Sequence, residues 1–192
     1  MQTKLTLLAG AAILCLPIPA SAQTYAMDRG VWVVGGSASV SHFDASGFDG
    51  GSTGISIYPD VGYFFVPGLL VLANVEYAHS SGGGTSTRYG AGPGLTYYFI
   101  KGPAKVHPYL AASVFFGHTQ FEVPAASYMN YSESYNSWYT SGGGALLLAR
   151  NVAVTGEAYY GQVHYGTGGV VGAASSTTMQ YGIRFGLAVY IY

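Results

Sequence analysis

The chain has 192 residues and a net charge of −1, with only 8% charged residues, 15% aromatic residues and 29 glycines. Soluble domains usually carry about 25% charged residues, and disordered chains combine high charge with few aromatic rings, so the composition argues against both classes. The chain also lacks the basic surface that nucleic-acid binding needs.

The first predicted element is a secretory signal peptide at residues 1–22. Lys4 provides the positive start, a short apolar core follows, and Ala-Ser-Ala at 20–22 forms a cleavage site of small residues. A lipoprotein signal at Cys15 is the weaker alternative, because a leucine precedes the cysteine where a small residue is expected. Cleavage leaves one domain, residues 23–192, that contains no cysteine and no apolar run of 18 residues.

Apolar residues alternate with small or polar residues through most of the chain after Gly30. A period of two is typical of strands. The candidate segments are about 11–15 residues long, whereas soluble strands usually have about 5–6 and a tilted membrane-crossing strand needs about 9–11. The predicted strands are residues 31–43, 53–65, 69–79, 85–99, 107–119, 135–148, 152–164 and 177–191.

The connections between these strands alternate in length. Short connections lie at 66–68, 100–105 and 149–151, and longer ones rich in Gly, Ser and Asn lie at 44–52, 120–134 and 166–176. Short turns at one end and long loops at the other are typical of outer-membrane barrels. The sequence therefore predicts an all-β fold, an eight-stranded antiparallel up-and-down transmembrane β-barrel, integral to the bacterial outer membrane.

The charged residues within the predicted strands lie on the face that carries glycines and small residues. A hairpin centred near Gly82 would place Glu76 directly opposite Arg88, with both side chains pointing inward. An Arg or Lys on the lipid face at mid-bilayer would cost about 2–4 kcal/mol. The same arithmetic pairs a second Glu with a second Arg. The predicted barrel-interior charge network is Glu76, Arg88, Glu157, Arg184 and Asp60.

An eight-stranded barrel has an interior that side chains only just fill. Five glycines on the inner face are therefore expected to leave room for the buried Arg and Glu side chains: Gly90, Gly92, Gly94, Gly182 and Gly186. The interior is predicted to be packed and polar. On the outer face, two interfacial belts of aromatic residues are predicted: Tyr63, Phe65, Tyr97 and Phe99 at one level, and Tyr77, Tyr89, Trp138 and Tyr160 at the other.

The stretches "GGGALLLARNVAVTGEAYYGQ" and "YGIRFGLAVYIY" resemble the last segments of small outer-membrane barrel proteins of the OmpA/OmpX-like kind. The resemblance implies an eight-stranded barrel with an interior ionic network, into which Glu76, Arg88, Glu157 and Arg184 fit by position. In such barrels the terminal aromatic residue usually lies on the lipid face. This chain departs from that pattern, because alternation places Ile191 outward and the terminal Tyr192 inward. Either a bulge shifts the register of the last strand, or the terminal signal that directs assembly into the outer membrane is degenerate.

The predicted role is structural or in surface interaction, without catalysis and without a cofactor or metal. The expected partners are outer-membrane lipids, the assembly machinery and an unidentified extracellular ligand, and the expected state is a monomer. Two alternatives stay open. One is a narrow channel for small solutes, and the other is a lipid-modifying enzyme in which "EYAHSS" supplies Glu76, His79 and Ser80.

The loop predicted at 120–134 is the candidate surface for contact with a partner. Tyrosine among small polar residues is suited to adaptable binding surfaces. The residues expected to make that contact are Phe121, Tyr128, Met129 and Tyr131.

Overall fold

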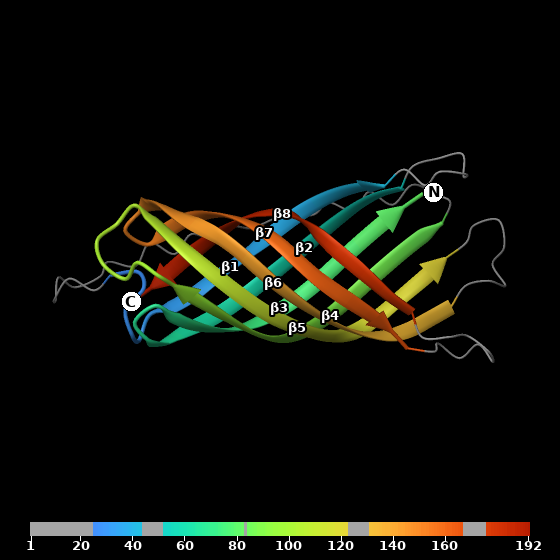
Figure 1. Ribbon diagram of the computed structural model, residues 1–192, viewed down its shortest axis with the longest axis horizontal. Helices are drawn as coiled ribbons and strands as arrows, with labels where there is room; N and C mark the ends of the chain where they lie inside the picture. The colour runs from blue at the N-terminus through green and yellow to red at the C-terminus, as the bar shows by residue number, and fades with distance from the viewer. Residues whose placement is uncertain (1–24, 44–51, 83, 123–130, 167–175) are drawn as a thin grey trace, which may run out of the picture.

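The computed structural model describes residues 25–43, 52–82, 84–122, 131–166 and 176–192. Eight strands make up the fold (Figure 1). They are β1 (Trp32–Phe43), β2 (Ser52–Val66), β3 (Leu69–Ser81), β4 (Thr85–Tyr98), β5 (Val106–Glu122), β6 (Tyr131–Ala149), β7 (Val152–Tyr165) and β8 (Ser176–Ile191). Within these ranges, no helix long and apolar enough to cross a membrane is found. The predicted signal peptide lies outside the described residues.

Each strand pairs antiparallel with the next, and β8 pairs with β1, so the sheet closes into a barrel. This arrangement confirms the predicted all-β, eight-stranded up-and-down fold. The strand ends that flank the predicted long connections lie at one end of the barrel, and the short turns lie at the other (Figure 1). These two ends are called the long-loop end and the short-turn end below.

The prediction of a loop over residues 120–134 is wrong at both of its margins. Strand β5 continues to Glu122 and β6 begins at Tyr131, and Phe121 lies directly opposite Tyr131 in the ladder. Alternation and β-forming residues carry on past the predicted strand ends, so pairing continues with them. Of the predicted contact residues, Phe121 and Tyr131 are therefore strand residues, and Tyr128 and Met129 lie outside the described part of the chain.

Two bulges lie close to the short turns. One interrupts the β2–β3 ladder between Phe64 and Val66, and the other interrupts the β6–β7 ladder between Leu147 and Ala149. Bulges are common at the rims of barrels, where they bend a strand toward a turn. In the β2–β3 turn, Gly68 adopts φ 80°, a conformation that favours glycine.

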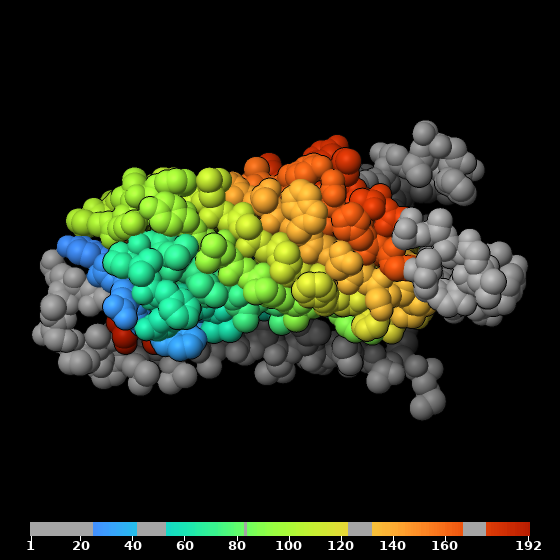
Figure 2. Space-filling model, turned by 60° about the horizontal axis from the view of Figure 1, so that its bottom comes forward, coloured from blue at the N-terminus to red at the C-terminus, as the bar shows by residue number. Residues whose placement is uncertain are grey.

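The outer face of the barrel is apolar between the two aromatic levels. Large hydrophobic side chains are exposed on every strand, and Figure 2 shows a continuous packed surface from β2 (teal) to β7 (orange). Rings on neighbouring strands contact one another in both belts, with centroids 5.1 Å apart for Trp32 and Tyr63 and 5.8 Å apart for Trp138 and Tyr160. Among the described residues between the belts, no Asp, Glu, Lys or Arg faces outward.

The last strand runs without a bulge in the described ladders to both of its neighbours. Ile191 is half-exposed on the outer face, and Tyr192 lies partly buried at the short-turn end. The Tyr192 hydroxyl donates a hydrogen bond of 2.6 Å to the backbone carbonyl of Arg150, whose guanidinium lies over the tyrosine ring. Strict alternation therefore continues to the end of the chain, and the last ring helps to cover the short-turn end.

Candidate functional site

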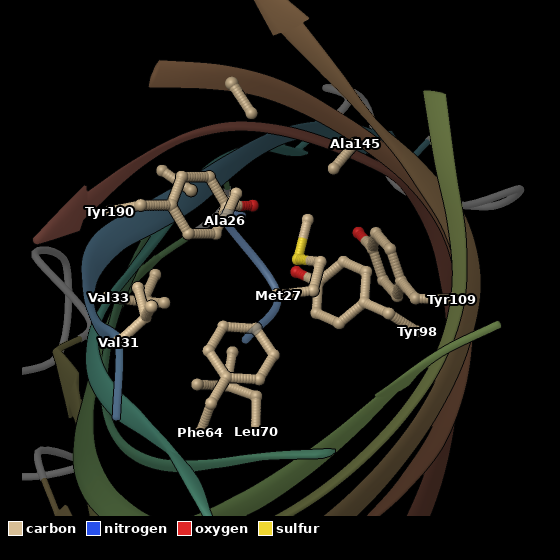
Figure 3. Close-up of a cluster of buried hydrophobic side chains, with 12 residues drawn as sticks. Ala26, Met27, Val31, Val33, Phe64, Leu70, Tyr98, Tyr109, Ala145 and Tyr190 are labelled. Atoms are coloured by element: carbon tan, nitrogen blue, oxygen red, sulfur yellow. The ribbon is translucent and has the colours of Figure 1, made fainter. Parts of the chain in front are cut away.

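An apolar plug closes the barrel at the short-turn end. The segment before β1 folds back into the barrel, and Figure 3 shows Met27 at the centre of a ring of side chains from several strands. Met27 is 0% exposed, and its backbone carbonyl accepts a 2.8 Å hydrogen bond from the N–H of Gly68. The ring around it includes Phe64, Tyr98, Tyr109 and Tyr190.

The plug does not follow from the strand pattern. The segment at 25–31 has no alternation, so nothing in the sequence assigns its side chains to the interior. Its turn is held by Asp28, whose carboxylate accepts a 2.7 Å hydrogen bond from the N–H of Tyr25. An Asp bonded to nearby backbone in this way is a turn signal, but it does not reveal where the turn docks.

Above the plug lies a lower charge cluster formed by Glu157 and Arg184. Glu157 Oε1 lies 3.6 Å from Arg184 Nη1. The other carboxylate oxygen accepts hydrogen bonds from the Ser141 hydroxyl at 2.7 Å and the Tyr109 hydroxyl at 3.2 Å. Glu157 stands directly opposite Arg184 in the β7–β8 ladder, as the spacing of the sequence predicts.

Three tyrosine rings surround the Arg184 guanidinium. Its central carbon lies 3.9 Å from the ring centroid of Tyr159, 4.0 Å from that of Tyr58 and 4.9 Å from that of Tyr139. Such cation–π contacts strengthen when water is excluded, and Arg184 is only 5% exposed. Its Nε and Nη2 atoms are buried without a hydrogen-bond partner. The rings therefore help to stabilise the buried cation, because its single long ion pair only partly compensates for the hydration that the guanidinium loses.

Asp60 lies in the same region but makes no direct ion pair among the described residues. It lines a cavity of about 100 Å³ together with Glu157 and Arg184. The structure therefore brings Asp60 next to the lower charge cluster without joining it to either partner.

A second, upper charge cluster lies closer to the long-loop end. Arg88 Nη2 donates to Glu76 Oε1 at 2.6 Å, and the Tyr135 hydroxyl donates to Glu76 Oε2 at 2.8 Å. Glu76 is 0% exposed and Arg88 is 7% exposed. The other hydrogen bonds of the guanidinium are long: 3.4 Å to the Tyr165 hydroxyl and 3.4 Å to the side-chain oxygen of Gln180.

The predicted register of this hairpin is wrong by two residues. Glu76 lies opposite Gly90 and Arg88 opposite Ala78, because the ladder closes at Ser81 and Thr85. Moving the centre of a hairpin by one residue moves each partner by two, and a shift of two preserves the face. Both charges therefore still point inward and meet diagonally across the ladder.

Two of the five predicted inner glycines, Gly90 and Gly182, make room for tyrosine rings. A Cβ atom on Gly90 would collide with the Tyr135 hydroxyl, and one on Gly182 would lie 3.0 Å from the Tyr159 hydroxyl. At these two positions, the prediction that the glycines accommodate the charged side chains themselves needs correction. Rings that contact Glu76 and Arg184 occupy the space, so the glycines serve the charges indirectly.

An open cavity, here called the vestibule, lies above the upper cluster and has a volume of about 600 Å³. Arg88 lies at its base, and none of the residues that line it in the described chain is Asp or Glu. Most of its inward-facing lining residues carry a hydroxyl group: Ser39, Ser41, Ser56, Tyr58, Ser80, Ser86, Thr119, Tyr159, Tyr165 and Thr178. The Thr119 hydroxyl oxygen and Arg88 Nε are buried without a hydrogen-bond partner.

The residues of "EYAHSS" do not assemble into a catalytic group. Glu76 and Ser80 share the inner face of β3, while His79 points outward and contacts the hydroxyl of Thr87 at 3.1 Å. His118 and His164 form similar contacts with Ser134 and Thr177 on the adjacent strand. In the described residues no group of three His, Cys, Asp or Glu side chains could hold a metal ion.

Among the comparisons with known proteins, the search of solved structures found similar folds. No family model and no curated protein matches the chain. The structure of Neisserial surface protein A (NspA) matches with a TM-score of 0.57 at 17% identity, over 83% of this chain and 96% of that one. The N-terminal β-barrel domain of Pseudomonas aeruginosa OprF matches with a TM-score of 0.49 at 14% identity, over 85% of this chain and 98% of that one. The outer membrane protein AlkL matches with a TM-score of 0.45 at 15% identity, over 92% of this chain and 96% of that one.

The protein therefore has the fold of the small eight-stranded outer-membrane barrels, which confirms the resemblance that its last two segments indicate. At this level of identity the likeness extends to the fold alone.

Proposed function

We propose that the protein is an integral outer-membrane barrel that binds a ligand or partner at the cell surface, without catalysing a reaction and without forming a pore. The long-loop end faces outside and the short-turn end faces the periplasm, which is the usual orientation for such barrels. The apolar outer face between two aromatic belts supports the location.

The asymmetry of the interior is the observation that carries the proposed role. The apolar plug around Met27 fills the short-turn end, and the two charge clusters with their tyrosine rings fill the middle. The vestibule of about 600 Å³ lies at the opposite end, within the usual size range of ligand sites. A barrel closed below and hollow above is suited to binding from the outside and not to passage through the barrel.

Two measurements test this function. The protein should fractionate with outer membranes and migrate faster in detergent gels before heating than after, because a folded barrel is compact. Planar bilayers that contain the folded protein should show no stable conductance. Recovery of the unlipidated chain in the soluble periplasm would overturn the location. Stable single-channel steps would overturn the closed barrel and favour the narrow channel.

A further inference from the structure

The barrel wall is incomplete between β1 and β8 at the long-loop end. The ladder between these strands runs from Trp32 opposite Ile191 to Ala38 opposite Phe185 and then stops. In contrast, β1 stays paired with β2 up to Phe43, and β8 stays paired with β7 down to Ser176. Figure 1 shows β1 (blue) and β8 (red) diverging toward the long-loop end. Above Ala38, two strand edges therefore face each other without pairing.

The exposure of the side chains beside this gap agrees with a missing neighbour. Tyr181 on β8 and Val40 on β1 are 81% and 74% exposed, the highest values among the large hydrophobic residues described. Ile183, which would lie opposite Val40 if the ladder continued, is 62% exposed. The outer rim of the gap is therefore apolar on both strands.

The gap begins within the depth of the apolar belt. Tyr181 lies directly opposite Tyr160, which belongs to the aromatic belt nearer the long-loop end. The last paired residue of β8, Phe185, lies four residues below that level, which corresponds to about 10 Å along the membrane normal for a tilted strand. The gap thus reaches from the headgroup level into the hydrocarbon of the outer leaflet.

The gap joins the lipid phase to the vestibule. The lining of the vestibule includes residues 39–41 of β1 and 178–183 of β8, on both sides of the gap. Unpaired backbone is tolerated at membrane depth only where it is buried in protein or lines a water-filled cavity. The two free edges meet this condition, because the polar vestibule lies directly behind them.

An occupant of this site must be apolar at one end and polar at the other. Its polar end would meet a surface with one guanidinium, several hydroxyls and no carboxylate in the described lining. The two hydrogen bonds that Arg88 donates to residues of the cavity lining, Tyr165 and Gln180, are each 3.4 Å long. A carboxylate oxygen accepts shorter, charge-assisted bonds from such donors.

We propose that the gap between β1 and β8 is a lateral access for a single-chain amphiphile with a carboxylate head, such as a long-chain fatty acid. The chain lies between Val40 and Ile183, and the head reaches Arg88 in the vestibule. The inference rests on the proposed function, because the gap opens into lipid only if the barrel spans the outer membrane.

The first test maps the binding site directly. The folded protein, reconstituted in phospholipid vesicles, is illuminated with a hexadecanoic acid that carries a diazirine in mid-chain. Adducts identified by mass spectrometry should concentrate on residues 39–41 and 179–183. Unlabelled hexadecanoic acid should compete at least tenfold better than hexadecanol, and octanoic acid should compete poorly. Adducts spread around the whole belt would mean ordinary boundary lipid and would overturn the proposal.

The second test closes the gap. In a Cys15→Ser background, V40C/I183C places two outward cysteines where a continued ladder would make them opposite. The matched control is V40C/I55C, because Val40 already lies opposite Ile55 in the β1–β2 ladder. Oxidation of V40C/I183C should abolish competable labelling, and reduction should restore it, while the control keeps wild-type labelling in both states. Unchanged labelling in the oxidised V40C/I183C protein excludes the gap as the access.

A third test asks whether Arg88 binds the carboxylate head of the ligand. The double variant E76Q/R88Q removes the buried ion pair without leaving one charge alone. It should lose about tenfold or more of the preference for the acid over the alcohol, while still binding both through the chain. A preference that survives intact would show that Arg88 does not hold the carboxylate.

Failure of this inference and failure of the proposed function give different results. Diffuse labelling of a protein that fractionates with outer membranes overturns only the lateral access. Recovery in the soluble periplasm overturns both.

Discussion

The buried ion pair between Glu76 and Arg88 allows a quantitative test of the packed interior. Arg88→Met removes the cation that lies 2.6 Å from Glu76 Oε1. Because Glu76 is 0% exposed, the carboxylate cannot recover its hydration. Removing one partner of a buried pair typically costs about 3–5 kcal/mol, and the free energy of unfolding should fall by that amount.

The double variant E76Q/R88M should be more stable than R88M alone. The glutamine is neutral, and its side-chain oxygen can still accept the hydrogen bond from Tyr135 that Glu76 now receives at 2.8 Å. We expect a coupling energy of about 2 kcal/mol or more from the double-mutant cycle. A well-packed neutral replacement of a buried pair often costs little.

The Glu157–Arg184 pair provides an internal comparison. Its closest atoms are 3.6 Å apart, and the Glu157 side chain is 13% exposed. Two hydroxyl groups also donate to Glu157, so the carboxylate keeps partners when Arg184 is replaced by methionine. The coupling energy of this pair should therefore be smaller than that of Glu76 and Arg88.

The measurement is urea unfolding in phospholipid vesicles, followed by tryptophan fluorescence and by mobility in unheated gels. The single variants, the two double variants and the wild type are compared under one set of conditions. Additive effects at both pairs would refute the reasoning, because they would show that these charges remain solvated and do not depend on each other.

The remaining predictions concern the plug, the inner glycines and the orientation. Met27→Ala should lower the free energy of unfolding by about 2–5 kcal/mol, because the side chain is 0% exposed at the centre of the plug; an unchanged urea midpoint would contradict that placement. Gly90→Ala should cost about 1–3 kcal/mol through overpacking against a tyrosine, whereas Gly144→Ala, whose nearest neighbour atom would be 3.8 Å away, should be nearly neutral in the same assay. In intact cells that produce the protein in a Cys15→Ser background, a membrane-impermeant maleimide should label Ser81→Cys at the long-loop end and spare Gly102→Cys at the short-turn end. The reverse pattern would mean an inverted barrel.

The packing of the interior explains why the chain contains so many tyrosines. Rings from four strands contact the two charge clusters, and several of them donate a hydroxyl to a carboxylate or to Gln180. A tyrosine fills an apolar interior and also provides one polar group at its tip. This combination lets the barrel hold charges without a wide aqueous lumen.

The sequence by itself determines which residues face inward and which face outward. A strand has a period of two, so the positions of Glu76, Arg88, Glu157 and Arg184 relative to the apolar residues assign them to one face. The same alternation predicts Ile191 outward and Tyr192 inward, as the structure has them. Register errors of two residues leave the face unchanged, which is why the interior charges can be assigned despite the misplaced centre of the β3–β4 hairpin.

Only the tertiary structure decides which inward residues meet and where the wall stays open. The plug around Met27 comes from a segment without periodicity, so its position depends on docking into a finished barrel. The gap between β1 and β8 lies between the first and last strands, the one strand pair that no hairpin joins directly. A short connection fixes the register of adjacent strands, whereas this pair must close through the curvature of all the others. The physical reason is that periodicity is a local property of the chain, while closure is a property of the whole sheet.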